Sequence, residues 1–297
     1  MARNELRSPI KWFGGKGNMV SKLLPLFPTH KSYVEVFGGG GSMLFAKSPS
    51  AKEVYNDIDE GLVNMFTVIK EPDTFNRLFH LLNWTPYARS EYFDCYETMN
   101  DDDLVIKAYK WMVVSRQSFS GYQGKWSSVV SLVRSEMAAT CNQWQSILRM
   151  LPDISSRLSD VTIICKTWKD VLNEYKDKDT LVYLDPPYIH STRRDGEYRF
   201  EMSNEDHEDM VDYLLSYSGM VLLSGYVHPI YERLESNGWV RTDIETVCSA
   251  VGRTRDTGIL GEGTGRATQM RIESVWRNPL CIKKCLNKGG LNFEEYQ

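Results

Sequence analysis

Residues 181–188 combine an apolar strand with an acid, two prolines and an aromatic ring. The run Leu-Val-Tyr-Leu at 181–184 is typical of a buried strand, and Asp185, Pro186, Pro187 and Tyr188 follow it directly. The prolines fix the backbone after the acid and have no N–H of their own to donate. The sequence therefore predicts a strand-tip carboxylate held beside a proline carbonyl in one rigid geometry.

This arrangement suits chemistry on the exocyclic amino group of a nucleobase. Such a nitrogen is a poor nucleophile because its lone pair is delocalised into the ring. Asp185 and the carbonyl of Pro186 would accept its two hydrogens and turn the lone pair toward an electrophile. Tyr188 would offer a stacking face to an extruded base, a contact worth about 1–3 kcal/mol. The alternative is an acid–proline turn that merely ends a strand.

A second segment, residues 33–42, runs from an apolar strand into four glycines and then a helix. Phe37 ends the strand, and Gly38 and Gly39 begin the turn. Glycines permit a tight strand-to-helix turn and let a ligand approach the backbone closely. A nucleoside-type cofactor fits this pattern, although a plain connection or a dinucleotide site would use the same residues.

Asp57 ends the next predicted strand, about 19 residues after Gly38. In doubly wound folds an acid at this place accepts hydrogen bonds from ribose hydroxyls. Helix capping is the alternative, because aspartate is common at that position. We assign ribose binding to Asp57 and capping of the following helix to Asp59.

Residues 11–16, with the sequence Lys-Trp-Phe-Gly-Gly-Lys, complete a set of three motifs. Together with the glycine turn and the Asp-Pro-Pro-Tyr segment, they resemble the Dam-like adenine-specific DNA methyltransferases. Their order matches the class alpha enzymes, in which the cofactor motifs precede the target-recognition insert and Asp-Pro-Pro-Tyr follows it. The similarity covers nearly the whole chain and reaches residues 273–279, which look like the family's closing strand.

The resemblance implies a cofactor and the residues that contact it. The cofactor is S-adenosylmethionine, whose methyl group moves to the exocyclic amino group of a flipped adenine in double-stranded DNA. Catalysis is assigned to Asp185, Pro186, Pro187 and Tyr188, with Asp185 lying between cofactor and target amine. The implied cofactor contacts are Trp12, Lys16, Phe37, Gly38, Gly39, Asp57, Asp170 and Asp185, of which Asp170 has the loosest match.

Residues 115–126 lie where relatives carry a hairpin that contacts DNA. We expect five of them to touch phosphates or to fill the gap left by the flipped base. These are Arg116, Phe119, Tyr122, Lys125 and Trp126. The segment departs from the enzymes that read GATC, so that target is not inherited.

Arg193 and Arg194 follow the Asp-Pro-Pro-Tyr motif closely. They are candidates for holding the DNA backbone beside the target base. A solvated loop is the alternative.

The order of predicted elements is that of an α/β fold. Strands at 33–37 and 53–57 alternate with helices at 18–27, from 42, and at 60–70. Alternation resumes with strands at 161–165, 181–184 and 220–223 and helices at 204–217 and 229–237. This pattern predicts a parallel sheet with crossover helices, here a Rossmann-like S-adenosylmethionine-dependent methyltransferase sheet.

Residues 72–160 differ, because their apolar residues recur at helical spacing around one polar loop at 115–128. We therefore expect a catalytic domain of residues 1–71 and 161–297, interrupted by a mainly helical target-recognition domain at 72–160. Near the C-terminus, strands at 240–247 and 269–276 flank a loop-like stretch at 249–267.

The formal net charge of −4 is unusual for a protein that binds DNA. Basic residues nevertheless gather in two segments, 107–149 with six basic residues against one acidic and 241–284 with eight against five. Such grouping matters more to a polyanionic partner than the global charge does. A solvated helix face or loop is the alternative.

Composition also excludes some classes. No apolar run reaches the roughly 18 residues of a membrane span, and no signal-peptide pattern is present. We expect a cytoplasmic protein, a monomer or weak dimer, without a membrane partner. The six cysteines lack metal-ligand spacing, so we expect reduced, mostly buried thiols and no metal.

Two rival functions stay open. Methylation of the cytosine ring requires a cysteine nucleophile, usually placed after a proline, and no cysteine in this sequence follows a proline. We treat His207 and His228 as structural, because neither has a partner pattern for nucleophilic catalysis. Methylation of the cytosine amino group uses related motifs. A catalytically silent DNA-binding relative would keep the same fold.

Overall fold

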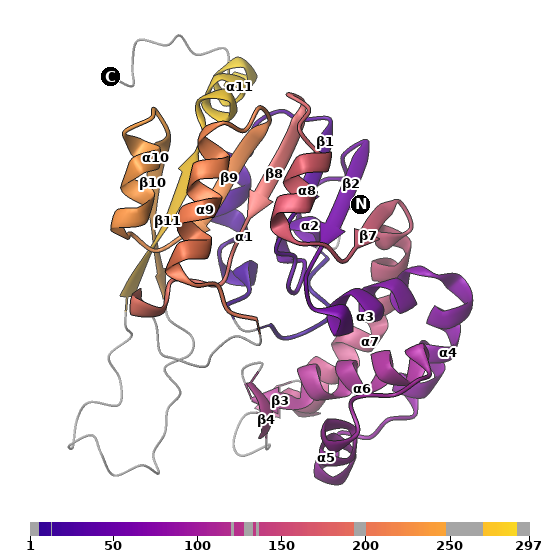
Figure 1. The fold of residues 1–297 in the computed structure, drawn as a ribbon. Coiled ribbons are helices and arrows are strands. Elements are labelled where there is room, and N and C mark those ends of the chain that lie inside the picture. Colours follow the sequence, from indigo (N-terminus) through magenta and orange to yellow (C-terminus); the bar gives the residue numbers. More distant parts are fainter. Residues whose placement is uncertain are drawn as a thin grey trace, which may run out of the picture.

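The computed structural model describes residues 6–12, 14–119, 122–127, 133–134, 137–192, 200–247 and 270–289. Within these residues, seven strands form one sheet in the order β10-β11-β9-β8-β1-β2-β7 (Figure 1). They are β1 (Ser32–Glu35), β2 (Lys52–Asn56), β7 (Val161–Ile164), β8 (Thr180–Leu184), β9 (Met220–Gly225), β10 (Val240–Val247) and β11 (Met270–Arg277). Neighbouring strands run parallel, except where β11 pairs with β9 and β10. The predicted α/β fold class is confirmed.

The strand order reverses between β1 and β8. From β1 the chain moves outward through β2 to β7, and it then returns to β8 on the other side of β1. Val34 of β1 lies between Val54 of β2 and Val182 of β8 in the register of the sheet. In open α/β sheets, ligands bind beyond the carboxyl ends of the strands at such a reversal. The ends of β1, β2 and β8 are therefore where a site is expected.

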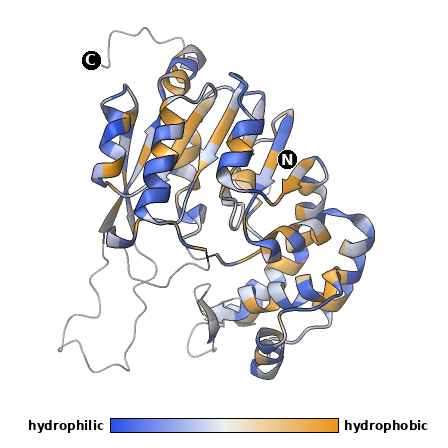
Figure 2. Cartoon of the chain, viewed as in Figure 1, coloured by the Kyte–Doolittle hydropathy of each residue, from blue (hydrophilic) through white to orange (hydrophobic). Residues whose placement is uncertain are grey.

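Alternating strand residues build two cores, one on each face of the sheet. Val34 and Val182 belong to the core under α8 (Trp168–Glu174), α9 (Asn204–Leu215) and α10 (Pro229–Glu235). Their neighbours Tyr33 and Leu181 belong to the opposite core, with α2 (Ser42–Ala46), α3 (Glu60–Lys70) and α11 (Pro279–Gly289). Figure 2 shows apolar residues concentrated on the strands and hydrophilic residues on the outer sides of the helices.

The segment between β2 and β7 is mainly helical. It contains α4 (Pro72–Asn83), α5 (Arg89–Glu97), α6 (Leu104–Gln117), α7 (Ala139–Leu158) and two short hairpins, β3 (Ser118–Phe119) with β4 (Tyr122–Trp126) and β5 (Val133–Arg134) with β6 (Met137–Ala138). Trp111 of α6 packs so closely on α3 that a Cβ at Gly61 would lie 2.2 Å from its Nε1. One continuous core joins these helices to the sheet, so the division into two domains stays a prediction.

The structure differs from the expected elements near Pro25 and after Ser115. The helix expected at 18–27 is broken into η1 (Lys16–Asn18), α1 (Val20–Leu23) and η2 (Leu24–Leu26). Pro25 lacks an N–H and crowds the preceding turn, which accounts for the end of α1 at Leu23. The loop expected at 115–128 is wrong over most of its length: α6 continues to Gln117, and the β3–β4 hairpin follows as far as Trp126.

Two helices were absent from the expectation. Thr167 caps α8 by accepting a hydrogen bond from the Asp170 N–H at 3.2 Å. Asn278 similarly accepts from the Cys281 N–H at 2.9 Å, and Pro279 opens α11. The stretch at 249–267 lies outside the described residues. In the described part of the chain, no helix is both long and apolar enough to cross a bilayer.

Candidate active site

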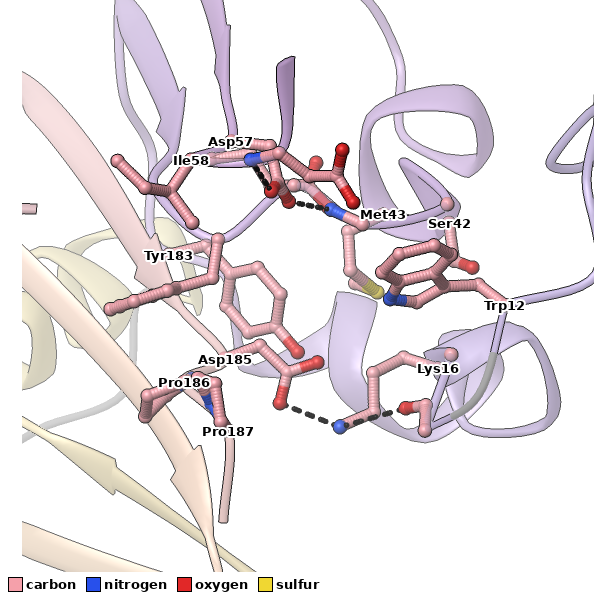
Figure 3. A pocket seen from close by; sticks show the side chains of 18 of the residues that line it. Trp12, Lys16, Ser42, Met43, Asp57, Ile58, Tyr183, Asp185, Pro186 and Pro187 are labelled. Atoms are coloured by element: carbon pink, nitrogen blue, oxygen red, sulfur yellow. Dashed lines mark hydrogen bonds and ion pairs between the residues drawn. The ribbon is translucent and has the colours of Figure 1, made fainter. Parts of the chain in front are cut away.

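A pocket opens at the carboxyl ends of β1, β2 and β8, where the strand order reverses. Its lining comes from five segments of the sequence, at 12–16, 35–43, 57–59, 183–187 and Phe200, and Figure 3 shows side chains from the lining around one space. The predicted site residues among them are Trp12, Lys16, Phe37, Gly38, Gly39, Asp57, Asp185, Pro186 and Pro187. The fold therefore brings the three sequence motifs together.

Asp185 follows the last residue of β8 and is largely buried. Its Oδ1 lies 2.6 Å from the Nζ of Lys16, whose side chain is only 5% exposed. Lys16 also donates to the backbone carbonyl of Gly14 at 3.3 Å (Figure 3). The strand-tip acid is thus held by an ammonium group supplied from the N-terminal motif.

Glu273 of β11 completes this ion cluster. Its Oε1 lies 3.0 Å from Lys16 Nζ and accepts a hydrogen bond from the hydroxyl of Tyr188. The same hydroxyl accepts from Lys16 at 2.6 Å. Lys16 Nζ therefore contacts three side chains, those of Asp185 and Tyr188 after β8 and that of Glu273 in β11.

The cluster determines the protonation of its members. Burial alone would lower the pKa of Lys16, but Asp185 and Glu273 raise it well above its ordinary value, so the group stays charged. Burial raises the pKa of Asp185 to about 6, while Lys16 opposes that rise and Glu273 adds to it. Asp185 is therefore mainly ionised at neutral pH.

Tyr188 is buried rather than presented to the pocket. It is 8% exposed, and its ring meets that of Tyr226 edge-on, with 4.6 Å between the ring centroids. Its hydroxyl points inward to Lys16 and Glu273. The expected stacking of Tyr188 on an extruded base stays a prediction.

Asp57 forms the other end of the pocket, just after β2. Its two oxygens accept hydrogen bonds from the N–H groups of Gly39 and Asp59, both at 2.8 Å. Burial raises the pKa of Asp57 to about 6, against the effect of these bonds. Asp59 caps α3 by accepting a hydrogen bond from the Gly61 N–H at 2.9 Å, so its predicted capping role is confirmed. The predicted ribose binding by Asp57 stays a prediction.

The glycine turn lets the protein's own rings approach the backbone. A Cβ at Gly38 would lie 2.2 Å from the ring of Tyr55, and one at Gly39 would lie 2.5 Å from the indole Nε1 of Trp12. Gly39 also has a φ of 47°, which disfavours other residues. The turn therefore seats Trp12 against the wall of the pocket beside Asp57.

Two acids near the site were missed at the level of sequence. Glu35 ends β1 and lines the pocket; it accepts from the Tyr33 hydroxyl and the Leu44 N–H, both at 3.0 Å. Burial raises its pKa to about 8, opposed by those hydrogen bonds. Its place just before the glycine turn was a usable signal. Glu273 offered only the weak signal of an acid within an apolar strand.

Asp170 is not among the residues that line the pocket. It lies in the first turn of α8, and its carboxylate accepts a hydrogen bond from the Thr167 hydroxyl at 2.6 Å. The prediction that it contacts the cofactor gains no support from this position.

The residues expected to bind DNA are only partly described. Phe119, which is 47% exposed, and Lys125, also exposed, present their side chains to solvent on the β3–β4 hairpin. The ring of Trp126 packs on that of Tyr87, with 5.8 Å between centroids. Tyr122 lies in β4, but its side chain is outside the described part, as are Arg193 and Arg194.

Arg116 lies in the last turn of α6, near Lys11. Its guanidinium donates to the carbonyl of Gln143 at 3.3 Å. Burial and the neighbouring charge of Arg7 lower its pKa to about 10, so it stays cationic. Burial and Arg116 lower the pKa of Lys11 to about 8. Positive charge is therefore concentrated beside the hairpin.

The remaining candidates have structural contacts. His207 is buried and hydrogen-bonds the Tyr231 hydroxyl at 2.9 Å, and His228 caps α10. Five described cysteines form no disulfide, and of these Cys95 and Cys281 are buried whereas Cys141, Cys165 and Cys285 are not. Across the described residues, no group of three His, Cys, Asp or Glu side chains is arranged to hold a metal ion.

Comparison with known proteins identifies relatives. Residues 12–241 match the family described as D12 class N6 adenine-specific DNA methyltransferase. A type II methyltransferase of Methanocaldococcus jannaschii is 26% identical over 209 residues, 62% of this chain and 70% of the relative. One of Lactococcus lactis is 24% identical over 90% of this chain and 95% of the relative. A DNA adenine methylase of Vibrio cholerae is 24% identical over 61% of this chain and 65% of the relative.

Proposed function

The chain belongs to the D12 class N6 adenine-specific DNA methyltransferase family, and from this premise we propose how its pocket carries out the reaction. The enzyme methylates adenine in DNA; methylation of cytosine and a silent relative are not favoured. The finer points proposed are the donor, the residues that hold it, and the residues that hold the target base. These proposals rest on the observation that Asp57 and Asp185 line the same pocket.

S-adenosylmethionine fits the groups that line this pocket. Asp57 offers a buried carboxylate for the ribose hydroxyls, and Trp12, Phe37 and Ile58 offer apolar surface. The acidic cluster around Asp185 suits a cation. When bound, the donor supplies a methyl group on a positively charged sulfur, which the target amine attacks as the carbon–sulfur bond breaks.

Asp185 and Pro186 orient the target. The Asp185 carboxylate and the Pro186 carbonyl accept the two hydrogens of the adenine amine, so that its lone pair faces the methyl group. After transfer, the extra proton on nitrogen passes to Asp185 or to solvent. Lys16 keeps Asp185 ionised through their 2.6 Å ion pair, which maintains it as an acceptor.

DNA lies against the β3–β4 hairpin in this proposal. Lys125 and Arg116 contact phosphates, and the aromatic residues Phe119, Tyr122 and Trp126 contact bases or fill the gap left by the flipped adenine. Double-stranded DNA is the proposed form of the substrate. Arg193 and Arg194 are proposed to hold the strand beside the target, and Tyr188 to border the flipped base.

A labelling experiment tests the reaction. The protein is incubated with duplex DNA and methyl-labelled S-adenosylmethionine, and the DNA is digested to nucleosides. With the unaltered protein we expect the label in N6-methyl-2′-deoxyadenosine. With the variant Asp185→Ala we expect no label in the DNA. Label in methylcytosine, or tight DNA binding without label, would contradict the proposal.

A further inference from the structure

The ion cluster behind the pocket contains more negative than positive charge. Lys16 contributes one ammonium, whereas Asp185 and Glu273 contribute one carboxylate each. The side chains of Lys16 and Glu273 are 5% and 7% exposed, and that of Asp185 is 17% exposed. The cluster therefore carries one uncompensated negative charge that water screens poorly.

Other groups around the pocket do not cancel this charge. Lys16 is the one lysine or arginine among the described residues that line it. Burial raises the pKa of Glu35 to about 8, which leaves it mainly protonated at neutral pH. Asp57 adds negative charge at the opposite end. The net sign of the pocket is therefore negative.

Holding Asp185 in place does not by itself require Glu273. An Asp185–Lys16 pair alone would have no net charge, and each member already has the other as its ionic partner. Glu273 adds contacts to Lys16 and Tyr188, and it adds the extra charge. In a medium of low effective dielectric, such a charge acts on a ligand several ångströms away.

We infer that the negative charge of Glu273 makes the pocket favour the cationic methyl donor over its demethylated product, which has no net charge. This inference rests on the proposed function, because it takes the ligand to be a sulfonium compound. The donor and product share their adenosine and amino-acid groups, so contacts to those groups contribute equally to both. The donor and the product differ by one unit of charge, and Glu273 interacts with that charge. A pocket of this kind releases its product as the charge disappears.

The experiment compares the affinities of the two ligands. Calorimetric titration of S-adenosylmethionine and S-adenosylhomocysteine gives two Kd values for each protein, and their ratio cancels shared contacts. In the variant Glu273→Gln, we expect the preference for the donor to fall on the order of tenfold. The Kd of the product should change little.

Two control variants separate charge from mere structure. Glu273→Asp keeps the carboxylate but shortens the side chain and so alters its contacts to Lys16 and Tyr188; the ratio should stay near the wild-type value. Glu245→Gln makes the same charge change on β10, where the side chain is exposed. It should leave both Kd values unchanged.

The outcomes distinguish this inference from the function on which it rests. If the wild-type protein binds neither ligand, the proposed donor is wrong. If it binds both and Glu273→Gln weakens both equally, or if Glu273→Asp lowers the ratio as much, Glu273 acts only through structure and the inference is overturned. Circular dichroism checks the fold, and Glu273→Met removes the same charge should the glutamine variant fail to fold.

Discussion

Lys16, from the N-terminal motif, and Asp185, which follows β8, form an ion pair of 2.6 Å whose side chains are 5% and 17% exposed. The pair keeps the acid ionised in a place where burial alone would favour its protonated form. The N-terminal motif thus has a contact beyond the cofactor contact expected of it: it supplies the charge that keeps Asp185, the proposed acceptor for the target amine, ionised.

Removal of the Asp185 carboxylate should stop methyl transfer without unfolding the protein. In Asp185→Ala, Lys16 keeps Glu273 as its partner at 3.0 Å, so no buried ammonium is left alone. We expect the single-turnover rate to fall by at least about a thousandfold. Thermal unfolding followed by circular dichroism should show a folded protein. Normal turnover in this variant would contradict the assigned role.

Removal of the Lys16 charge should damage stability as well as activity. Lys16→Met leaves Asp185 and Glu273 close together without a compensating charge. Breaking a buried pair in this way costs about 3–5 kcal/mol, measurable by urea unfolding. Because Lys16 lowers the pKa of Asp185, that pKa should rise and the pH profile of transfer should move to higher pH. An unchanged pH profile would contradict the proposal that Lys16 keeps Asp185 ionised.

Transfer should depend on pH through Asp185. Its pKa of about 6 means that the acceptor is lost as pH falls through 6, with a roughly tenfold fall in rate per pH unit below it. Since this folded-state pKa lies above that of an unfolded chain, protonating Asp185 favours folding, and the loss through this group is not unfolding. Asp57 also has a pKa of about 6, so the rate is measured at saturating cofactor.

Much of the site was predictable because its motifs end strands. Asp57 and Asp185 follow β2 and β8 immediately, and the parallel arrangement places both at one edge of the sheet. Knowing that two strands are parallel and near each other is enough to bring their tips together. The helix cap at Asp59 is a local feature and was read from local sequence.

Glu273 was beyond such reasoning. It reaches Lys16 only because β11 inserts antiparallel between β9 and β10, an order that local pattern does not specify. The inward turn of the Tyr188 hydroxyl depends on the same strand. Likewise, Asp170 matched a motif loosely, yet its carboxylate serves the start of α8.

Asp57 and Asp170, two of the three acids predicted to contact the cofactor, should behave differently. Asp57→Asn removes a buried charge that lines the pocket, and we expect S-adenosylmethionine to bind about ten- to a hundredfold more weakly. Asp170→Asn changes an acid that does not line the pocket and serves as the matched control. Isothermal titration calorimetry of both variants with S-adenosylmethionine measures the two affinities. An equal loss of affinity in the two variants would show that the cofactor site extends to α8.

The β3–β4 hairpin should bind DNA without affecting the cofactor. Phe119→Ala and Lys125→Gln remove exposed side chains, and we expect each to weaken DNA binding several-fold, by up to about 1–3 kcal/mol for a stacking residue. Lys52→Gln makes the same charge change at the start of β2, the end of the strand away from the pocket. Fluorescence anisotropy with labelled duplex measures all three, and an equal effect of Lys52→Gln would argue against the hairpin.

The most direct test is a crystal structure of the protein with duplex DNA and S-adenosylhomocysteine. The account predicts an adenine turned out of the duplex, with its amino nitrogen at about 2.7–3.2 Å from both the Asp185 carboxylate and the Pro186 carbonyl and facing the sulfur. A base that stays stacked, or an amine bound away from Asp185, would contradict it.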